Sequence, residues 1–315
     1  MHNAKTGATY HAFLYDNEVV TDLGTLPGHN ESQAVAINNL DPPTVVGYSH
    51  NNVTGPKRAV QWSEGVAIDL EVPIGPRNEA SGVNDKNQIV GWMGVSWPSI
   101  ASASLPFLWS DGTTIQLPLP LSAINGAADS INNIGDVIGN YRRSNPIGSG
   151  TVTRGLMWQH GKIVEFTPFS GFAHSTTSGV NDRTQVVGHF SNGGSDFTAF
   201  LWQNNSIYTL ESLIPAHSTF TGVTVHSINN NSEIVGTATL IGSGTTVGVV
   251  LLPIPPVIGD VDCDQKVNVP DLLTVIHSWG ACAPPAFGIN CPADLDSDSN
   301  VGLNDLLTVV LNWAP

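Results

Sequence analysis

A short apolar phrase that ends in an aromatic residue recurs along most of the chain, and this repeat limits the folds open to it. The aromatic residues are Tyr15, Trp62, Trp109, Trp158 and Trp202, and a polar turn follows each of them. Successive aromatic residues are separated by 44 to 49 residues. A period of this length indicates one supersecondary unit that is repeated several times.

A second phrase occurs once in each period. It consists of an apolar residue, two turn residues and a strand that ends in Gly, and its copies run over 37–47, 83–91, 131–139, 180–188 and 228–236. The turn residues are Asn-Asn or Asn-Asp pairs, which tolerate positive φ and favour tight hairpins. A shorter strand, such as 21–23 or 68–70, lies between the two phrases. Each repeat therefore predicts four short strands.

Four strands in a unit of this length are typical of a β-propeller blade. One blade cannot bury both of its faces, whereas blades stacked around an axis do so. The sequence thus predicts a mainly β fold, a propeller of about five four-stranded repeats from Val19 to about Pro253. Six blades with a truncated N-terminus are the alternative, because His11–Tyr15 is left over. A β-sandwich and an open solenoid are the alternative architectures.

The repeat phrases also resemble a known family. The strand His11–Leu14 and the Ile-Asn-Asn…Val-Val-Gly phrase look like the HAF repeat, a family of bacterial extracellular repeats. The resemblance extends over all five units, about 245 residues. It implies an extracellular location and a repeated fold, but no particular reaction.

The last part of the chain contains one short sequence motif twice, and the two copies begin 34 residues apart. Each copy places Asp at positions 1, 3, 5 and 12 of a loop, which is the spacing of an EF-hand-type calcium loop. Position 7 contributes a backbone carbonyl, so its side chain can vary. The predicted ligands are Asp260, Asp262, Asp264, Lys266 and Asp271 in the first loop, and Asp294, Asp296, Asp298, Asn300 and Asp305 in the second. We expect two Ca²⁺ ions.

Both loops depart from the general pattern at two positions. Position 12 is Asp, whose side chain has a shorter reach than that of Glu. Position 6 is Gln265 or Ser299 rather than Gly. A residue other than Gly at that sharp turn costs about 1 kcal/mol. The sequence therefore predicts calcium binding that is weaker than in the tightest class of EF-hand.

An amphipathic helix is predicted after each loop. The helix Asp271–Trp279 places Leu272, Leu273, Ile276 and Trp279 on one face, and Asp305–Trp313 places Leu306, Leu307, Val310 and Trp313 at the same offsets. Two loop–helix units without proper entering helices resemble a type I dockerin module, over roughly 57 residues. The resemblance implies a calcium-dependent cohesin-like partner, contacted around loop positions 10 and 11. These positions are Val269 and Pro270, then Leu303 and Asn304, and the Ser-Thr pair common in cellulosomal dockerins is absent.

These observations predict three segments and a location. They are a HAF-repeat propeller over 1–252, a Pro-rich linker over 253–259 and a dockerin-like module over 260–315. A disulfide between Cys282 and Cys291 would hold the connection between the two loop–helix units, and pairing of Cys263 with Cys282 is the alternative. Since modules of this kind are usually extracellular, we expect a secreted or cell-surface protein. Met1 runs directly into a strand without a signal peptide, so we expect a truncated start.

The charge of the chain excludes some partners. The formal net charge is −15 and there is no basic cluster, which argues against nucleic acid and against an anionic membrane surface. No apolar run is long enough for a membrane span.

No catalytic set rises above chance. Asp22, Asp69 and Glu165 recur at equivalent places after the aromatic strands, as structural residues do, and the recurring Trp residues are expected to pack between blades. The residues favour a non-catalytic binding or scaffold protein, tethered to a cohesin-like or cell-surface partner. The alternative is a polysaccharide-degrading enzyme or a glycan-binding propeller that the dockerin-like module delivers.

Overall fold

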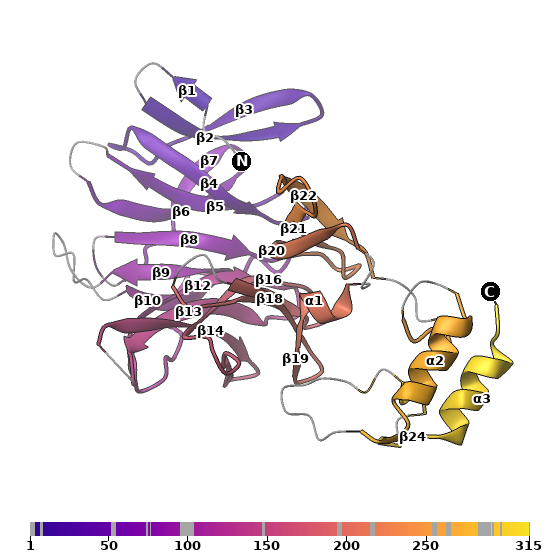
Figure 1. Cartoon of the computed structure of the whole chain (residues 1–315). Coiled ribbons are helices and arrows are strands. Elements are labelled where there is room, and N and C mark those ends of the chain that lie inside the picture. Colours follow the sequence, from indigo (N-terminus) through magenta and orange to yellow (C-terminus); the bar gives the residue numbers. More distant parts are fainter. Residues whose placement is uncertain are drawn as a thin grey trace. The chain divides into compact units, whose positions relative to one another are not determined.

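A computed structural model of the chain describes residues 4–314, except 7–8, 52–54, 74, 76, 95–103, 147–148, 194–196, 215–217, 254–256, 263–265, 283–290, 292 and 297. The chain divides into two compact units, Met1–Asp196 and Phe197–Pro315, which are described separately (Figure 1). In the part of the chain that is described, no helix is long and apolar enough to cross a membrane.

The first unit is built from consecutive antiparallel sheets. A three-stranded sheet begins it, with β1 (Ala4–Thr6), β2 (Thr9–Asp16) and β3 (Val19–Gly24). Three four-stranded sheets follow, in which the strands pair in chain order. Their strands are β4 (Glu31–Ile37), β5 (Val45–His50), β6 (Lys57–Ser63) and β7 (Val66–Asp69); β8 (Arg77–Val83), β9 (Ile89–Gly94), β10 (Ser104–Ser110) and β11 (Thr113–Gln116); and β12 (Ala123–Ile131), β13 (Val137–Ser144), β14 (Thr151–Gln159) and β15 (Lys162–Phe166). The hairpin β16 (His174–Val180) and β17 (Val186–Ser191) ends the unit.

Apolar side chains fill the space between successive sheets of this unit. In β5, Val45 packs with Trp62 of the same sheet and with Ala12 of the sheet before, whereas Val46 packs with Phe107 of the sheet after. Successive strand residues point to opposite faces, so both faces of each inner sheet are buried. Four-stranded antiparallel sheets stacked face to face in chain order are the blade arrangement of a β-propeller (Figure 1). The predicted mainly β fold is confirmed.

The grouping of strands within a repeat differs from the prediction. The count of five repeats from Val19 assumes that each unit ends with its aromatic strand, and therefore groups each short strand with the aromatic strand that follows it in the chain. In the structure the short strand β7 pairs with β6, the aromatic strand that precedes it, and closes the same sheet. β11 and β15 do the same with β10 and β14. A period fixes the length of a repeat, but not the residue at which it starts.

The Asn pairs also have a different role from the one predicted. None of them adopts positive φ; in their turns that conformation belongs to later residues such as Asn87, Gly135 and Thr184. Instead, the first Asn of the first four pairs is buried, and the amides of Asn38, Asn84 and Asn132 each reach the next sheet. Asn84 Nδ2 donates to the carbonyl of Asn132 at 3.0 Å, and Asn132 Nδ2 donates to the carbonyl of Asn181 at 2.8 Å. The pairs therefore join neighbouring sheets as well as turning the chain.

The second residue of each pair adds a parallel row of bonds. The backbone N–H of Asn39 donates to Asp85 Oδ1 at 2.7 Å, that of Asp85 to Asn133 Oδ1 at 2.8 Å, and that of Asn133 to Asp182 Oδ1 at 2.7 Å. We call the two rows the Asn ladder; it comprises Asn38, Asn39, Asn84, Asp85, Asn132, Asn133, Asn181 and Asp182. Because the ladder repeats at the blade period, it fixes how each sheet sits on the next.

The Gly that ends the second phrase is required by close packing. A Cβ at Gly91 would overlap the backbone carbonyl oxygen of Glu79 and lie 2.9 Å from the ring of Phe107. Gly47, Gly139 and Gly236 meet backbone carbonyl oxygens in the same way.

We therefore expect Gly91→Ala to lower the free energy of unfolding by about 3 kcal/mol, because neither the carbonyl nor the buried ring can move away without disturbing the strand pairing. The matched control is Gly248→Ala, since a Cβ there meets no atom within 4 Å. Its effect should stay within about 0.5 kcal/mol. Denaturant unfolding of the full chain measures both, and equal effects would contradict this account of the repeat.

The second unit contains a β part and a small module. Its β part has β18 (Phe197–Gln203) paired with β19 (Ser206–Thr209), a short helix α1 (Leu210–Leu213), and a sheet of β20 (Phe220–Ile228), β21 (Ile234–Leu240) and β22 (Thr246–Leu251). The two-loop module spans 257–314 and has α2 (Val269–His277), β23 (Gly280–Ala281), β24 (Asn300–Val301) and α3 (Leu303–Leu311), with the two helices side by side (Figure 1).

Candidate functional site

The first acidic loop brings three of its predicted ligands together. A carboxylate oxygen from each of Asp260, Asp262 and Asp271 lies within 4.8 Å of the others, so the group could hold a metal ion. Asp264, together with Cys263 and Gln265, lies outside the described residues. Lys266 is described, at the position where a backbone carbonyl is expected to bind.

The carboxylate of Asp271 anchors both ends of this loop. It is fully buried, and its Oδ1 accepts the backbone N–H groups of Val261 at 2.6 Å and Asp262 at 3.1 Å. Its Oδ2 accepts the N–H of Asn268, the N-cap residue directly before α2, at 2.8 Å. An acid in the first turn of a helix also interacts favourably with the helix dipole. Asp271 thus ties the start of the loop to the start of the helix.

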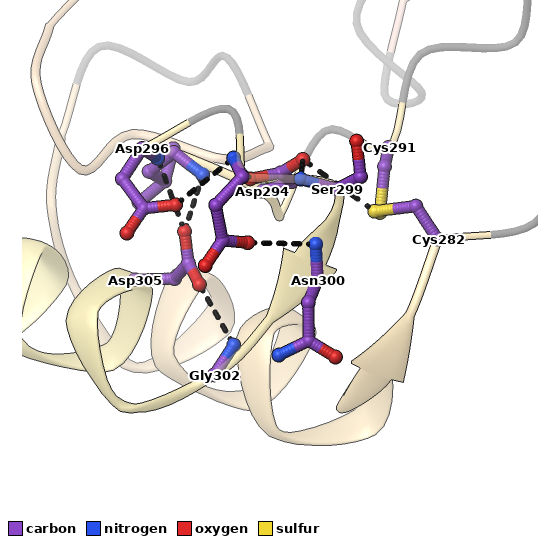
Figure 2. The surroundings of a disulfide bond; sticks show 10 residues. Cys282, Cys291, Asp294, Asp296, Ser299, Asn300, Gly302 and Asp305 are labelled. Atoms are coloured by element: carbon purple, nitrogen blue, oxygen red, sulfur yellow. Dashed lines mark hydrogen bonds between the residues drawn. A yellow bond between two sulfur atoms is a disulfide. The ribbon is translucent and has the colours of Figure 1, made fainter.

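The second loop repeats this arrangement with Asp294, Asp296 and Asp305, whose oxygens also lie within 4.8 Å of one another. Asp305 Oδ1 accepts the N–H groups of Leu295 and Asp296, and its Oδ2 accepts that of Gly302 at 2.7 Å (Figure 2). The two closing carboxylates, which are 34 positions apart, are therefore bound in the same way.

Asp298, a further predicted ligand of the second loop, lies beside this group rather than in it. The backbone N–H of Asp298 donates to Asp294 Oδ1 at 3.1 Å, and Asp298 Oδ1 accepts the N–H of Asn300 at 2.8 Å. Asn304, at loop position 11, donates from Nδ2 to Asp296 Oδ2 at 3.0 Å. Pro270 occupies the same position in the first loop and has no such donor.

Asp305 is held in its ionised form. Burial of its carboxyl opposes ionisation, but the hydrogen bonds that it accepts from the backbone of Gly302, Leu295 and Asp296 together outweigh burial and hold its pKa below the ordinary value. Its charge is therefore available to balance a cation in the second loop.

The two loops are joined reciprocally through their eighth positions. Val267 of the first loop exchanges backbone hydrogen bonds with Ala314, which follows the second helix, at 3.1 and 2.9 Å. Val301 of the second loop pairs with Gly280, which follows the first helix. Val267 and Val301 are fully buried with Val275 of α2 and Val309 of α3. Sequence analysis did not single out these valines, although each recurs at the 34-residue offset.

The helix residues that are buried in the structure differ from the apolar face that the sequence predicted. Val275 and Val309 are the fully buried apolar helix residues, and Leu272 and Leu306 are partly buried. The other predicted face residues are exposed, by 41% to 53%; they are Leu273, Ile276, Trp279, Leu307, Val310 and Trp313. Each helix also starts and ends two residues earlier than predicted, so both Trp residues follow their helix. Small valines from the loops fill the core, which leaves the larger side chains outside.

A disulfide joins Cys282 and Cys291, as the sequence favoured, with a Cα–Cα distance of 5.8 Å (Figure 2). The alternative partner Cys263 lies outside the described residues.

In the β region, the three recurring acids have local partners. Asp22 accepts from His11 at 3.0 Å, Asp69 forms an ion pair with Arg58 at 3.0 Å, and Glu165 accepts from the Tyr141 hydroxyl at 2.6 Å. His11 and Arg58 occupy the same place in successive aromatic strands, four residues before Tyr15 and Trp62. Asp22 and Asp69 thus join their short strands to the neighbouring aromatic strand, whereas Glu165 of β15 reaches β13, beyond β14, in the same sheet.

The recurring Trp residues pack between sheets, as predicted, whereas Tyr15 is exposed. Trp62 and Trp158 are almost fully buried, and the indole N–H of Trp158 donates to the carbonyl of Pro118 at 2.6 Å. Trp109 packs against the core between the second and third sheets. These side chains are therefore structural.

One acid of the β region was missed by the sequence analysis. Asp129 is the extra residue of the bulge in β12, and burial raises its pKa to about 6, against the lowering effect of a 2.5 Å hydrogen bond from Asn140. Asn140 also accepts the N–H of Thr177 in the next hairpin. A bulge follows no hydrophobic period, so the sequence carried no sign of it.

Comparison with known proteins gives distant likenesses. No protein-family model matches the chain, and no curated protein matches it. Similar solved structures include the β-propeller domain of the Trilobed protease from Pyrococcus furiosus (10% identity, TM-score 0.42), which aligns with 69% of this chain over 64% of its own length, less than two thirds. A second is a fucose-specific lectin from Aleuria aurantia, with 13% identity and a TM-score of 0.39, which aligns with 70% of this chain over 75% of its own length. A third is a puromycin-hydrolyzing peptidase of Mycobacterium tuberculosis, with 12% identity and a TM-score of 0.43, which aligns with 81% of this chain over 46% of its own length. None of these likenesses bears on what this chain binds.

The fold and the site together define a propeller-type β protein that carries a small helical module with two acidic, metal-competent loops. The HAF-repeat and type I dockerin resemblances stay predictions.

Proposed function

We propose that the protein is a non-catalytic extracellular or cell-surface binding protein, in which a calcium-loaded, dockerin-like module tethers the propeller to a protein partner. The observation that carries this proposal is the duplicated exposed apolar face beside two duplicated acid groups. We call this face the module face; it comprises Leu273, Ile276, Trp279, Leu307, Val310 and Trp313. Each half of the module thus exposes apolar residues at the same offsets, and large exposed apolar surface generally marks an interaction site.

The donor chemistry of both loops supports calcium. The grouped ligands are carboxylate oxygens, which suit a hard cation, and the 34-residue repeat supplies each group with the same loop positions. Three carboxylates within 4.8 Å repel one another, and a divalent cation would relieve that repulsion. Asp260, Asp262 and Asp271 would hold one ion, and Asp294, Asp296 and Asp305 the other.

Calcium would control whether the two helices that carry the module face are ordered. Asp271 and Asp305 connect each loop to the first turn of its helix, so ordering of a loop fixes the start of α2 or α3. Binding to the folded module and not to the unfolded chain stabilises the folded form. The two helices then present equivalent residues from both halves. The Cys282–Cys291 disulfide supports an oxidising, extracellular setting.

The test begins with capture of partners by the full chain, from envelope and secreted proteins of its source, with calcium or with a chelator. A captured protein is then purified, and its affinity for the chain is measured by calorimetry. We expect Trp279→Ala with Trp313→Ala to weaken that affinity at least thirtyfold and to leave calcium affinity unchanged, because buried Trp residues dominate protein interfaces.

The matched control is Ile115→Ala, an exposed apolar residue on β11, far along the chain from the module; it should change neither affinity. A partner that binds equally in chelator, or that ignores the double Trp variant, would contradict the tether. Calcium-independent binding of the chain to a polysaccharide in a parallel glycan screen would favour the alternative of a glycan-binding propeller.

A further inference from the structure

The disulfide lies directly against the second acidic loop (Figure 2). Cys291 precedes Asp294, the first loop position, and its carbonyl accepts the backbone N–H of Asp294 at 2.9 Å. On the other side, Cys282 Sγ lies 3.6 Å from Asp294 Oδ2. The bond therefore lies at the entry of the loop and next to one of its carboxylates.

Cys282 is also joined to the middle of the same loop. Its backbone N–H donates to the carbonyl of Ser299 at 3.0 Å. The two residues before it continue this pairing, because Ala281 pairs with Asn300 and Gly280 with Val301. Loop positions 6 to 8 are thus hydrogen-bonded to the segment that ends at Cys282, and the disulfide connects this segment covalently to the loop entry.

The first loop is held differently. Its eighth residue, Val267, pairs with Ala314, and the N–H of Asp260 donates to the carbonyl of Val257 at 3.0 Å. Within the described residues, the Cys282–Cys291 bond is the disulfide of the molecule, and it does not touch this loop. Two loops with matching acids therefore differ in how strongly their backbone is constrained.

We infer that Cys282 and Cys291 are positioning residues for the second metal loop, and that their disulfide sets the calcium affinity of this loop far more than that of the first loop. The inference rests on the proposed calcium binding. With the bond intact, the entry of the second loop and its positions 6 to 8 stay at a fixed separation before metal arrives. Without it, the loop samples open forms that the metal has to order. A dithiol converts the bond to two thiols and is itself oxidised to a disulfide.

The experiment uses the full chain with Cys263→Ser, which prevents disulfide exchange with the third cysteine. Calcium affinity is measured by calorimetry on the oxidised chain, on the chain reduced by a dithiol, and on Cys282→Ser with Cys291→Ser. We expect two binding events when the chain is oxidised, one of which weakens by roughly ten- to a hundredfold without the bond, as the loop entropy of a short disulfide ring suggests.

Assignment of the weakened event needs a site-specific measurement. Backbone amide NMR during the calcium titration follows Gly302 in the second loop and Asn268 in the first, so no ligand has to be mutated. Gly302 should respond at the weakened affinity in the reduced chain, whereas Asn268 should shift by less than about threefold. Weakening of both loops to the same extent, or of neither, would overturn the inference. An oxidised chain that binds no calcium would instead overturn the proposed function.

Discussion

Asp305→Asn is expected to abolish calcium binding by the second loop and to destabilise the two-loop module by about 3 kcal/mol. Both oxygens of this buried carboxylate accept backbone N–H groups, from Leu295 and Asp296 on one side and Gly302 on the other. An amide places an NH₂ group against one of these donors, whichever way it turns. The variant therefore loses a charge and leaves a buried donor without an acceptor, each of which costs one to a few kcal/mol.

Calorimetric calcium titration and denaturant unfolding of the full chain measure the two effects. The stoichiometry should fall from two ions to one, with at least a hundredfold loss at the altered loop. Asp271→Asn should produce the same change in the first loop, because Asp271 is bound in the same way. Asp111→Asn is the matched control, an exposed turn residue of the β region with positive φ, which Asn tolerates. Retention of two ions by Asp305→Asn would show that the second loop does not need Asp305 as a metal ligand.

The sequence revealed the loops because their ligands are local in the chain. Asp residues at fixed loop positions predict the site by spacing alone, and the structure brings the carboxylates of Asp260, Asp262 and Asp271 together. What the spacing did not show is how each loop depends on the other half of the module. The pairs Val267–Ala314 and Val301–Gly280 join residues from different repeats. Contacts of this kind have no local period.

The helical faces show a second limit. An apolar pattern at helical spacing normally marks the buried side, yet Ile276 and Trp279 are exposed and Val275 is buried. The pattern identified a helix correctly but did not indicate which of two apolar stripes packs inward. The small core formed with Val267 and Val301 accommodates valine. An apolar stripe left outside such a core is itself evidence for an interaction surface.

The blade repeat was predictable for a related reason, and its start was not. The unit is defined by strand alternation, which is a local pattern, and by the spacing of the aromatic residues, which is periodic. Which short strand closes which sheet depends on pairing between strands, as with β6 and β7. The Asn pairs were assigned to turn geometry, because a bond from Asn84 to Asn132 crosses 48 residues. Their regular recurrence was the available sign that they do more than turn the chain.

Asn132→Ala is expected to lower the free energy of unfolding of the first unit by about 4 kcal/mol. Asn132 is buried, and its Oδ1 accepts the backbone N–H groups of Gly135 at 2.9 Å and Asp136 at 2.7 Å. Its Nδ2 donates to Asp136 Oδ2 at 3.1 Å and to the Asn181 carbonyl in the next sheet at 2.8 Å. Removal of the side chain leaves several buried polar groups without this partner, at about 1–3 kcal/mol each. For a unit of this size, the melting temperature should fall by roughly 10 °C.

Two further variants separate the turn from the link between sheets. Asn132→Asp keeps the acceptor for the turn N–H groups but replaces the donor with an oxygen that faces Asp136 and the Asn181 carbonyl, so it should cost nearly as much as alanine if the link dominates. Asn229→Ala removes the same turn acceptor at an exposed site, where water replaces the lost bonds, and should cost about 1 kcal/mol. If Asn132→Asp were as mild as Asn229→Ala, the Asn ladder would be only a series of turns. A large cost for Asn132→Asp would mean that the repeated Asn fixes the spacing of successive blades, and that the second phrase of each repeat recurs because of sheet-to-sheet packing within this chain rather than to bind a ligand.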